Sequence, residues 1–148
     1  MNRRRFVALA GGAGAIAVAG CLDDDDPPAE PEYGDWFDNT DNFDGFEDRT
    51  DAETVTVLVG AGEQGWQFDP PAITVTPGTV VRFEWTGSGG DHNVEHADTD
   101  WQNPEGLVAQ DGHTWERTFD DPGTHRYKCW PHEQLGMRGA IFVDAYAE

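Results

Sequence analysis

The sequence contains few positively charged residues. Among its 148 residues, nine are Lys or Arg and 29 are Asp or Glu, which gives a formal net charge of −20. The single lysine is Lys128, and three of the arginines are Arg3, Arg4 and Arg5. Such an excess of negative charge disfavours nucleic acid and anionic membrane surfaces as partners.

The acidic residues are not confined to one tail. They begin at Asp23 and continue past Glu84 to Asp144. Removing the first twenty residues would leave six basic residues against 29 acidic ones, a charge of −23. This composition resembles that of proteins from extreme halophiles, because the screening length falls to about 3 Å in 1 M salt and the self-repulsion then largely disappears.

Cysteine is also scarce, since the chain has only Cys21 and Cys129. In an exported protein, a pair of cysteines is first read as a disulfide. We disfavour that interpretation here, because each cysteine lies in a separate motif that explains it better.

The sequence has no apolar run long enough to cross a membrane as a helix. The Gly/Ala-rich stretch 6–19 is shorter than the roughly 20 apolar residues that a span requires. The run 3–7 resembles a twin-arginine export signal, and the run 18–21 resembles the lipobox of bacterial and archaeal lipoproteins. We therefore expect residues 1–20 to be a cleaved signal peptide and Cys21 to carry a lipid. The alternative is an uncleaved apolar anchor.

Two segments separate this signal from the main domain. Residues 21–32 are rich in Asp, Glu and Pro, and they predict an extended acidic tether that follows the lipid anchor. Residues 33–52 form a lead-in that interleaves five aromatic residues with acids. Because so many aromatics are unfavourable in water, we expect the lead-in to lie against the domain in turns or a short irregular helix. The alternative is an aromatic surface that docks a partner.

Residues 53–148 predict an all-β domain. Short stretches of alternating apolar and polar residues are separated by turns, and no helical period is present. This pattern is typical of an antiparallel β-sandwich. The residues from 96 to 112 predict a long excursion between strands. The expected strands cover 54–59, 73–75, 79–85, 114–119, 124–129 and 138–143, and a turn is expected at 68–71.

The nine residues from Cys129 to Met137 combine a thiolate, the imidazole of His132 and a thioether. A thioether is an unusual zinc ligand. Two His and one Cys in a plane with a weak axial Met form the electron-transfer site of blue copper proteins. The run supplies three of these ligands, and the best candidate for the second imidazole is His92.

Each candidate ligand also has an ordinary interpretation. Cys129 and Met137 could simply fill the core, and the two histidines could lie in surface loops. A zinc site with His92 and His96 on one helical face fits the spacing, but the glycines at 87–90 disfavour a helix there. The joint occurrence of all four residues makes copper the better explanation.

Residues 54–143 resemble the cupredoxins, and among them the plastocyanin-like archaeal branch called halocyanins. The resemblance rests on these motifs: 68–70, 75–80, Trp85, 90–94, 122–124, Tyr127 and the spacing Cys129-x₂-His132-x₄-Met137-Arg138-Gly139. It implies a cupredoxin-like Greek-key sandwich with one copper ion, Cu(I) or Cu(II). His92, Cys129, His132 and Met137 would be the ligands. Asn93 would not bind the metal itself but would hold the ligand loops in place.

The resemblance implies a monomeric electron carrier rather than an enzyme. It would be anchored on the outer face of the cell membrane after twin-arginine export and exchange electrons with membrane-bound partners of the respiratory chain. An enzyme of the multicopper type would need further histidine clusters, which the scattered His96, His113 and His125 do not provide. Two other classes stay open: a surface protein that binds or delivers copper, and an adhesion module.

Overall fold

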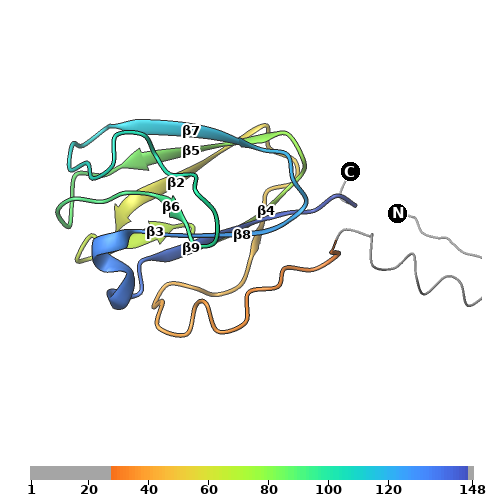
Figure 1. The fold of residues 1–148 in the computed structure, drawn as a ribbon, viewed down its shortest axis with the longest axis horizontal. Helices are drawn as coiled ribbons and strands as arrows, with labels where there is room; N and C mark the ends of the chain where they lie inside the picture. The colour runs from red at the N-terminus through yellow and green to blue at the C-terminus, as the bar shows by residue number, and fades with distance from the viewer. Residues whose placement is uncertain (1–27, 147–148) are drawn as a thin grey trace, which may run out of the picture.

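The structure is a computed structural model that describes residues 28–146, and these residues form a sandwich of two sheets (Figure 1). The first sheet has the order β1-β4-β9-β8-β6, and the second has the order β3-β2-β5-β7. The bounds of the first sheet are β1 Glu47–Asp48, β4 Ala72–Val75, β9 Arg138–Val143, β8 Gly123–Lys128 and β6 Glu95–His96. Those of the second are β3 Gln67–Asp69, β2 Thr54–Ala61, β5 Thr79–Trp85 and β7 Thr114–Phe119.

The alternation of apolar residues explains why the sheets face each other. In β5, Val81, Phe83 and Trp85 are buried while Arg82 is exposed. A strand sends successive side chains to opposite faces, so such a pattern buries one face and solvates the other. The inner faces of both sheets supply one continuous core, which also contains Cys129 and Met137. Cys129 and Met137 are therefore held in the packed interior.

The all-β, cupredoxin-like sandwich predicted from the sequence is confirmed, although the sheets are mixed rather than purely antiparallel. Strand β2 runs parallel to β5, β4 runs parallel to both β1 and β9, and the other pairs are antiparallel. Parallel pairs arise where the chain crosses from one sheet to the other between neighbouring strands. Alternation within a strand reports burial but not the direction of its neighbour.

Strands β5, β7 and β9 have the bounds that the sequence predicted, and the predicted turn at 68–71 is partly wrong. Two connecting segments contain local structure that was not predicted. Residues 68–71 were expected to form a turn, but Phe68 lies in β3 and pairs with Val59 of β2. The excursion 96–112 is tied down by β6 and by a bridge between His92 and Val108. The loop between Cys129 and Met137 forms a 3₁₀ helix, η3, Trp130–Leu135.

The lead-in 33–52 packs on the outer face of the first sheet in turns, with the two-residue strand β1 and no helix among its residues. Trp36 and Phe37 are buried against Ala72 and Ala140. In Figure 1 this segment, coloured orange, runs below β8 and β9 toward the end of the sandwich that carries η3. The aromatic residues are thus largely used for packing, which leaves little of them for a partner.

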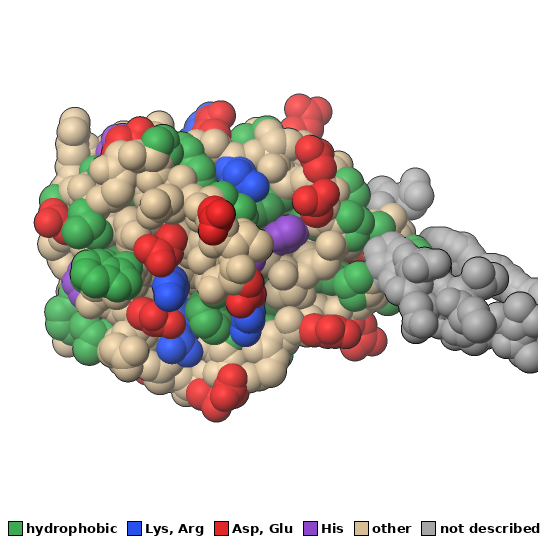
Figure 2. All heavy atoms as spheres, in the orientation of Figure 1, with side chains coloured by type: hydrophobic (Ala, Val, Ile, Leu, Met, Phe, Trp, Pro, Cys, Tyr) green, Lys and Arg blue, Asp and Glu red, His purple; other side chains and the backbone are tan. Residues whose placement is uncertain are grey.

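The expected signal peptide, Cys21 and most of the tether lie outside the described residues 28–146. Within that range, no helix is both long and apolar enough to cross a membrane. Acidic side chains are spread over the face shown in Figure 2, and basic side chains lie beside them.

Candidate metal centre

Three metal-binding side chains from two distant segments meet at one end of the sandwich. They are His92, which precedes β6, Cys129, which follows β8, and His132 in η3. The Nδ1 atoms of the two histidines are 3.2 Å apart. The sulfur of Cys129 lies 3.6 Å from Nδ1 of His92 and 3.4 Å from Nδ1 of His132. Three donor atoms thus converge on one point.

The size and chemistry of this triangle fit a single copper ion. Nitrogen and sulfur donors bind first-row metals at about 2.0–2.3 Å, so donors in a trigonal plane lie roughly 3–4 Å from one another. The three observed separations fall in that range. A thiolate with two imidazoles in a trigonal arrangement is the donor set of a blue copper site.

The orientation of His92 is set by backbone groups around its ring. Its Nε2 lies 2.7 Å from the carbonyl oxygen of Ser88, so Nε2 carries the proton and donates it, which leaves Nδ1 free to bind metal. Gly60, with φ of +97°, allows this close approach, because a Cβ there would come within 3.1 Å of Nε2. The indole of Trp85 donates to the carbonyl of His92 at 3.0 Å. These contacts fix the orientation of the His92 ring without a bound metal.

Cys129 is fully buried at the end of β8. Burial raises the pKa of its thiol to about 11, since the apolar surroundings disfavour the thiolate. The backbone N–H groups of Asn93 and His132 hydrogen-bond to the sulfur and oppose that shift in pKa. They are positioned to stabilise negative charge on the sulfur once a metal displaces the proton.

His132 is the most solvent-accessible of the three residues, since it is half-buried while His92 and Cys129 are not exposed at all. Its ring stacks on the indole of Trp66, with centroids 5.8 Å apart and planes inclined by 21°. Burial lowers the pKa of both His92 and His132, and the proximity of His92 lowers that of His132 further. Both imidazoles are therefore neutral near pH 7, the form that binds metals.

Met137 and Asn93 connect the pieces of the site. Met137 is fully buried beside Cys129, whose N–H donates to the Met137 carbonyl at 3.2 Å. The side-chain oxygen of Asn93 accepts from the N–H of Trp130 at 2.7 Å, and its amide nitrogen donates to Glu95 at 2.8 Å. Asn93 thus links the segment of His92 to the residue that follows Cys129.

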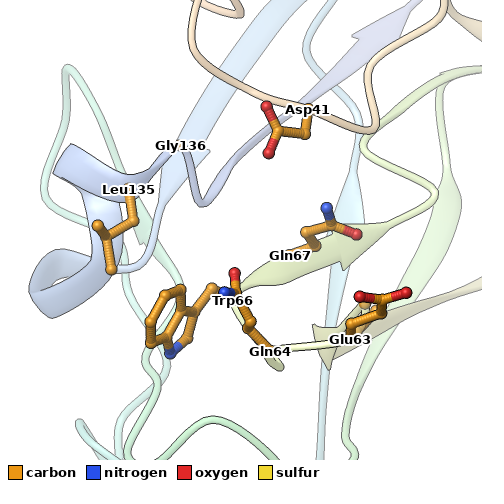
Figure 3. Close-up of a pocket in the computed structure, with 9 residues that line it drawn as sticks. Asp41, Glu63, Gln64, Trp66, Gln67, Leu135 and Gly136 are labelled. Atoms are coloured by element: carbon orange, nitrogen blue, oxygen red, sulfur yellow. The ribbon is translucent and has the colours of Figure 1, made fainter.

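A pocket lies beside the site, and Figure 3 shows its lining. Trp66, Leu135 and Gly136 form the part near η3, whereas Asp41, Glu63, Gln64 and Gln67 supply polar groups. None of the three clustered donors is among its lining residues. The pocket is therefore distinct from the metal-binding triangle.

The other three histidines do not join the cluster in the described part of the chain. His96 is buried, and its Nδ1 accepts the N–H groups of Asp98 and Thr99, each at 2.9 Å. The ring of His113 packs edge-on against Trp85, and Nε2 of His125 lies 2.8 Å from the carbonyl of Asp121. Hydrogen bonds or ring packing therefore account for all three of these histidines.

Sequence reasoning missed Trp66, Ser88 and Gly60 as parts of the site. Ser88 acts through its backbone carbonyl, which any residue would supply, so its identity carries no sequence signal. Trp66 lies in a Gly-rich stretch that shows no strand period. Only the folded arrangement brings it over His132.

Comparison with known proteins gives a consistent result. Residues 55–144 match the family model described as copper binding proteins, plastocyanin/azurin family. The chain is 41% identical over 161 aligned positions to "Halocyanin" from Natronomonas pharaonis, covering 97% of this chain and 98% of that protein. It is 34% identical to "Plastocyanin" from Scenedesmus fuscus, covering 60% of this chain and 98% of that protein.

The fold is also similar to a solved structure, the oxidized form of plastocyanin from Dryopteris crassirhizoma. The TM-score is 0.50 at 25% identity, and the match covers 60% of this chain and 99% of that one. These findings confirm the resemblance to halocyanins and plastocyanins that the motifs predicted. They also confirm copper as the cofactor that the donor set fits.

Proposed function

The chain belongs to the plastocyanin/azurin family of copper-binding proteins and is a blue copper electron carrier, and from this premise we propose how its residues work. His92, Cys129 and His132 would hold the copper ion, and Met137 would supply a weaker fourth ligand through its thioether. The observation that carries this assignment is the convergence of three donor atoms within 3.2–3.6 Å of one another. Met137 is buried in the same core as Cys129, and its carbonyl accepts the N–H of Cys129.

The bound copper supplies a one-electron couple between Cu(I) and Cu(II). The chain keeps the donor atoms fixed while that charge changes. The Ser88 carbonyl and Trp85 hold His92, the backbone pairing between Cys129 and Met137 holds the sulfurs, and Trp66 covers His132. A fixed donor set reduces the rearrangement that accompanies electron transfer, and a set of four protein ligands leaves no position for a substrate. We therefore propose a carrier and not a catalyst.

Electrons enter and leave through His132, because it is the candidate ligand with an accessible edge. Two exposed apolar side chains of η3 lie close to it in the chain, Trp130 at 64% exposure and Leu135 at 51%. Long-range charge steering is weak at high salt, so we propose that partners dock on this apolar surface. Replacing Leu135 with aspartate should slow reduction by a redox partner without changing the copper spectrum. An unchanged rate would contradict the docking surface.

The optical and electron paramagnetic resonance spectra of the copper-loaded protein test the assignment. An intense blue colour that bleaches on reduction is expected, because it arises from the bond between thiolate and copper. Replacing Cys129 with serine should abolish the colour and leave the far-ultraviolet circular dichroism unchanged. A colourless copper complex of the wild-type protein would favour copper delivery, and a variant that stays blue would remove Cys129 from the site.

We also propose that the protein is a monomer anchored to the outer face of the cell membrane through a lipid on Cys21. The motifs at 3–7 and 18–21 support this, and respiratory-chain proteins in the membrane would be its partners. An anchor with two acyl chains holds stably, whereas one chain holds only marginally. Replacing Cys21 with alanine should release the protein into the soluble fraction with its copper spectrum intact. Retention after a high-salt wash would instead indicate an uncleaved apolar anchor.

A further inference from the structure

A short stretch of the lead-in lies against the end of the ligand loop. The lead-in is fixed to the sheet by an aromatic cluster in which Phe37 and Phe43 stack with centroids 4.0 Å apart and planes inclined by only 4°. Tyr33 and Phe46 pack on the same rings. Residues 36–40, which we call the brace, are therefore held firmly where the sheet meets η3. The brace precedes residue 55, at which the family match begins.

The brace contacts the chain immediately before Met137. The hydroxyl of Thr40 donates to the carbonyl of Gly136 at 2.9 Å, and this bond is buried. The amide of Asn39 donates to the carbonyl of Gln134 at 3.2 Å. Gly136 has φ of +95°, and a Cβ at that position would collide with the carbonyl oxygen of Asn39. Backbone passes directly against backbone here, which only glycine permits.

The brace also contacts the chain immediately after Met137. The guanidinium of Arg138 donates to the carbonyl of Trp36 at 2.9 Å and lies 4.7 Å from the centre of its indole ring. The indole nitrogen of Trp36 in turn donates to the carbonyl of Gly139 at 3.0 Å, in a buried hydrogen bond. Residues on both sides of Met137 are thus tied to the same five-residue segment.

We propose that the brace is a positioning element for Met137 and thereby sets the reduction potential of the copper site. A thioether bound weakly as an axial ligand cannot fix its own place, so the surrounding backbone must fix it. Thr40 is the clearest positioning residue, because its hydroxyl reaches the residue next to Met137. This inference rests on the proposed role of Met137 as the axial ligand.

The test compares three variants of the full chain. Thr40→Val removes the hydroxyl at nearly constant volume, and Thr40→Ser keeps it. Thr50→Val is the matched control, because the Thr50 hydroxyl bonds only within its own turn, to Asp48 at 2.7 Å. The fold should survive Thr40→Val, since the Gly136 carbonyl still accepts the N–H of Arg138 at 2.9 Å. The reduction potential and the paramagnetic resonance spectrum are measured for each.

A hydrogen bond between neutral groups changes an equilibrium constant by about two- to tenfold. We expect Thr40→Val to change the ratio of Cu(I) to Cu(II) affinity about threefold. A one-electron couple shifts by about 59 mV per tenfold, so the potential should rise by about 28 mV. The direction follows because a loosened thioether donates less to Cu(II). Thr40→Ser and Thr50→Val should both stay close to wild type.

Hydrogen exchange in the metal-free protein provides a readout that does not depend on copper. The amides of Gly136 and Met137 should exchange several-fold faster in Thr40→Val and not in Thr50→Val. If Thr40→Val changed neither the exchange of these amides nor the reduction potential, the proposed role of the brace would be overturned. A fall in potential, or an equal shift in the Thr50 control, would overturn it as well. A wild-type protein that is not blue would instead refute the proposed ligand set, so the two failures can be told apart.

Discussion

Replacing Asn93 with alanine tests how strongly the two halves of the metal site are tied together. Asn93 is 5% exposed, and its oxygen accepts the N–H of Trp130 at 2.7 Å. Alanine would leave that N–H, which is only part-buried, without its protein partner, at a cost of about 1 kcal/mol. Because about 1 kcal/mol shifts the melting temperature of a domain of this size by roughly 4 °C, the metal-free protein should melt roughly 4 °C lower.

Asn103 provides a matched control. It is 1% exposed, its oxygen accepts the N–H of Val94 at 2.8 Å, and its amide donates to the carbonyl of Gly106 at 2.8 Å. Replacing Asn103 with alanine should destabilise the domain at least as much, because two backbone groups lose their partner. It should leave the copper spectrum unchanged, since these bonds do not reach the chain after Cys129. The Asn93 variant should alter that spectrum.

Urea and thermal unfolding in high salt, on metal-free and copper-loaded protein, would decide the matter. The reasoning fails if Asn93→Ala lies within about 0.5 kcal/mol of wild type, the usual range for a surface substitution. It also fails if the Asn103 variant changes the copper spectrum as much as the Asn93 variant does, because destabilisation alone would then account for both.

Three further outcomes are expected. Replacing Met137 with glutamine should keep copper bound and lower the reduction potential, because an oxygen donor favours Cu(II); an unchanged potential in voltammetry would point to another axial group. Burial lowers the pKa of His92, His96 and His132, so the unfolded chain binds protons more readily. The stability of the metal-free protein should therefore be full well above the ordinary histidine pKa of 6.5 and fall as the pH drops below it. A urea midpoint in high salt that does not change as the pH falls below 6.5 would contradict the three shifts. Dilution from 1 M to 0.01 M salt lengthens the screening distance from about 3 Å to about 30 Å and should destabilise the metal-free domain more than loss of copper does in high salt. Melting temperatures that do not vary with salt would refute this.

The sequence predicted the fold class, and it named the three donor residues that the fold brings together, for physical reasons. Alternation within strands such as Thr79–Trp85 depends on which face is buried, and that information is local. Cys129 and His132 are three positions apart, so a short turn must bring them together. His92 was the best candidate for the second imidazole, and the resemblance of residues 90–94 to the halocyanin motif implied it as a ligand.

The remaining features depend on contacts that sequence spacing does not encode. The parallel pairing of β2 with β5 is set by how the chain crosses between sheets. The stacking of Trp66 on His132 joins two residues that are far apart in the sequence. The hydrogen bond from Thr40 to Gly136 links a residue before the domain to one in the ligand loop. Each requires the complete packing arrangement.

The hydrogen bond between the Trp36 indole and the Gly139 carbonyl joins residues 103 positions apart and has a consequence for the order of folding. Translation proceeds from the N-terminus, so Trp36 is made early and waits for a partner made near the end. Contacts between such distant residues form slowly, because closing the intervening loop costs chain entropy. We therefore expect the ligand loop and the brace to come together late in folding. A chain made only part of the way to Gly139 lacks the assembled copper site, so we expect the ion to be captured after this segment has been synthesised.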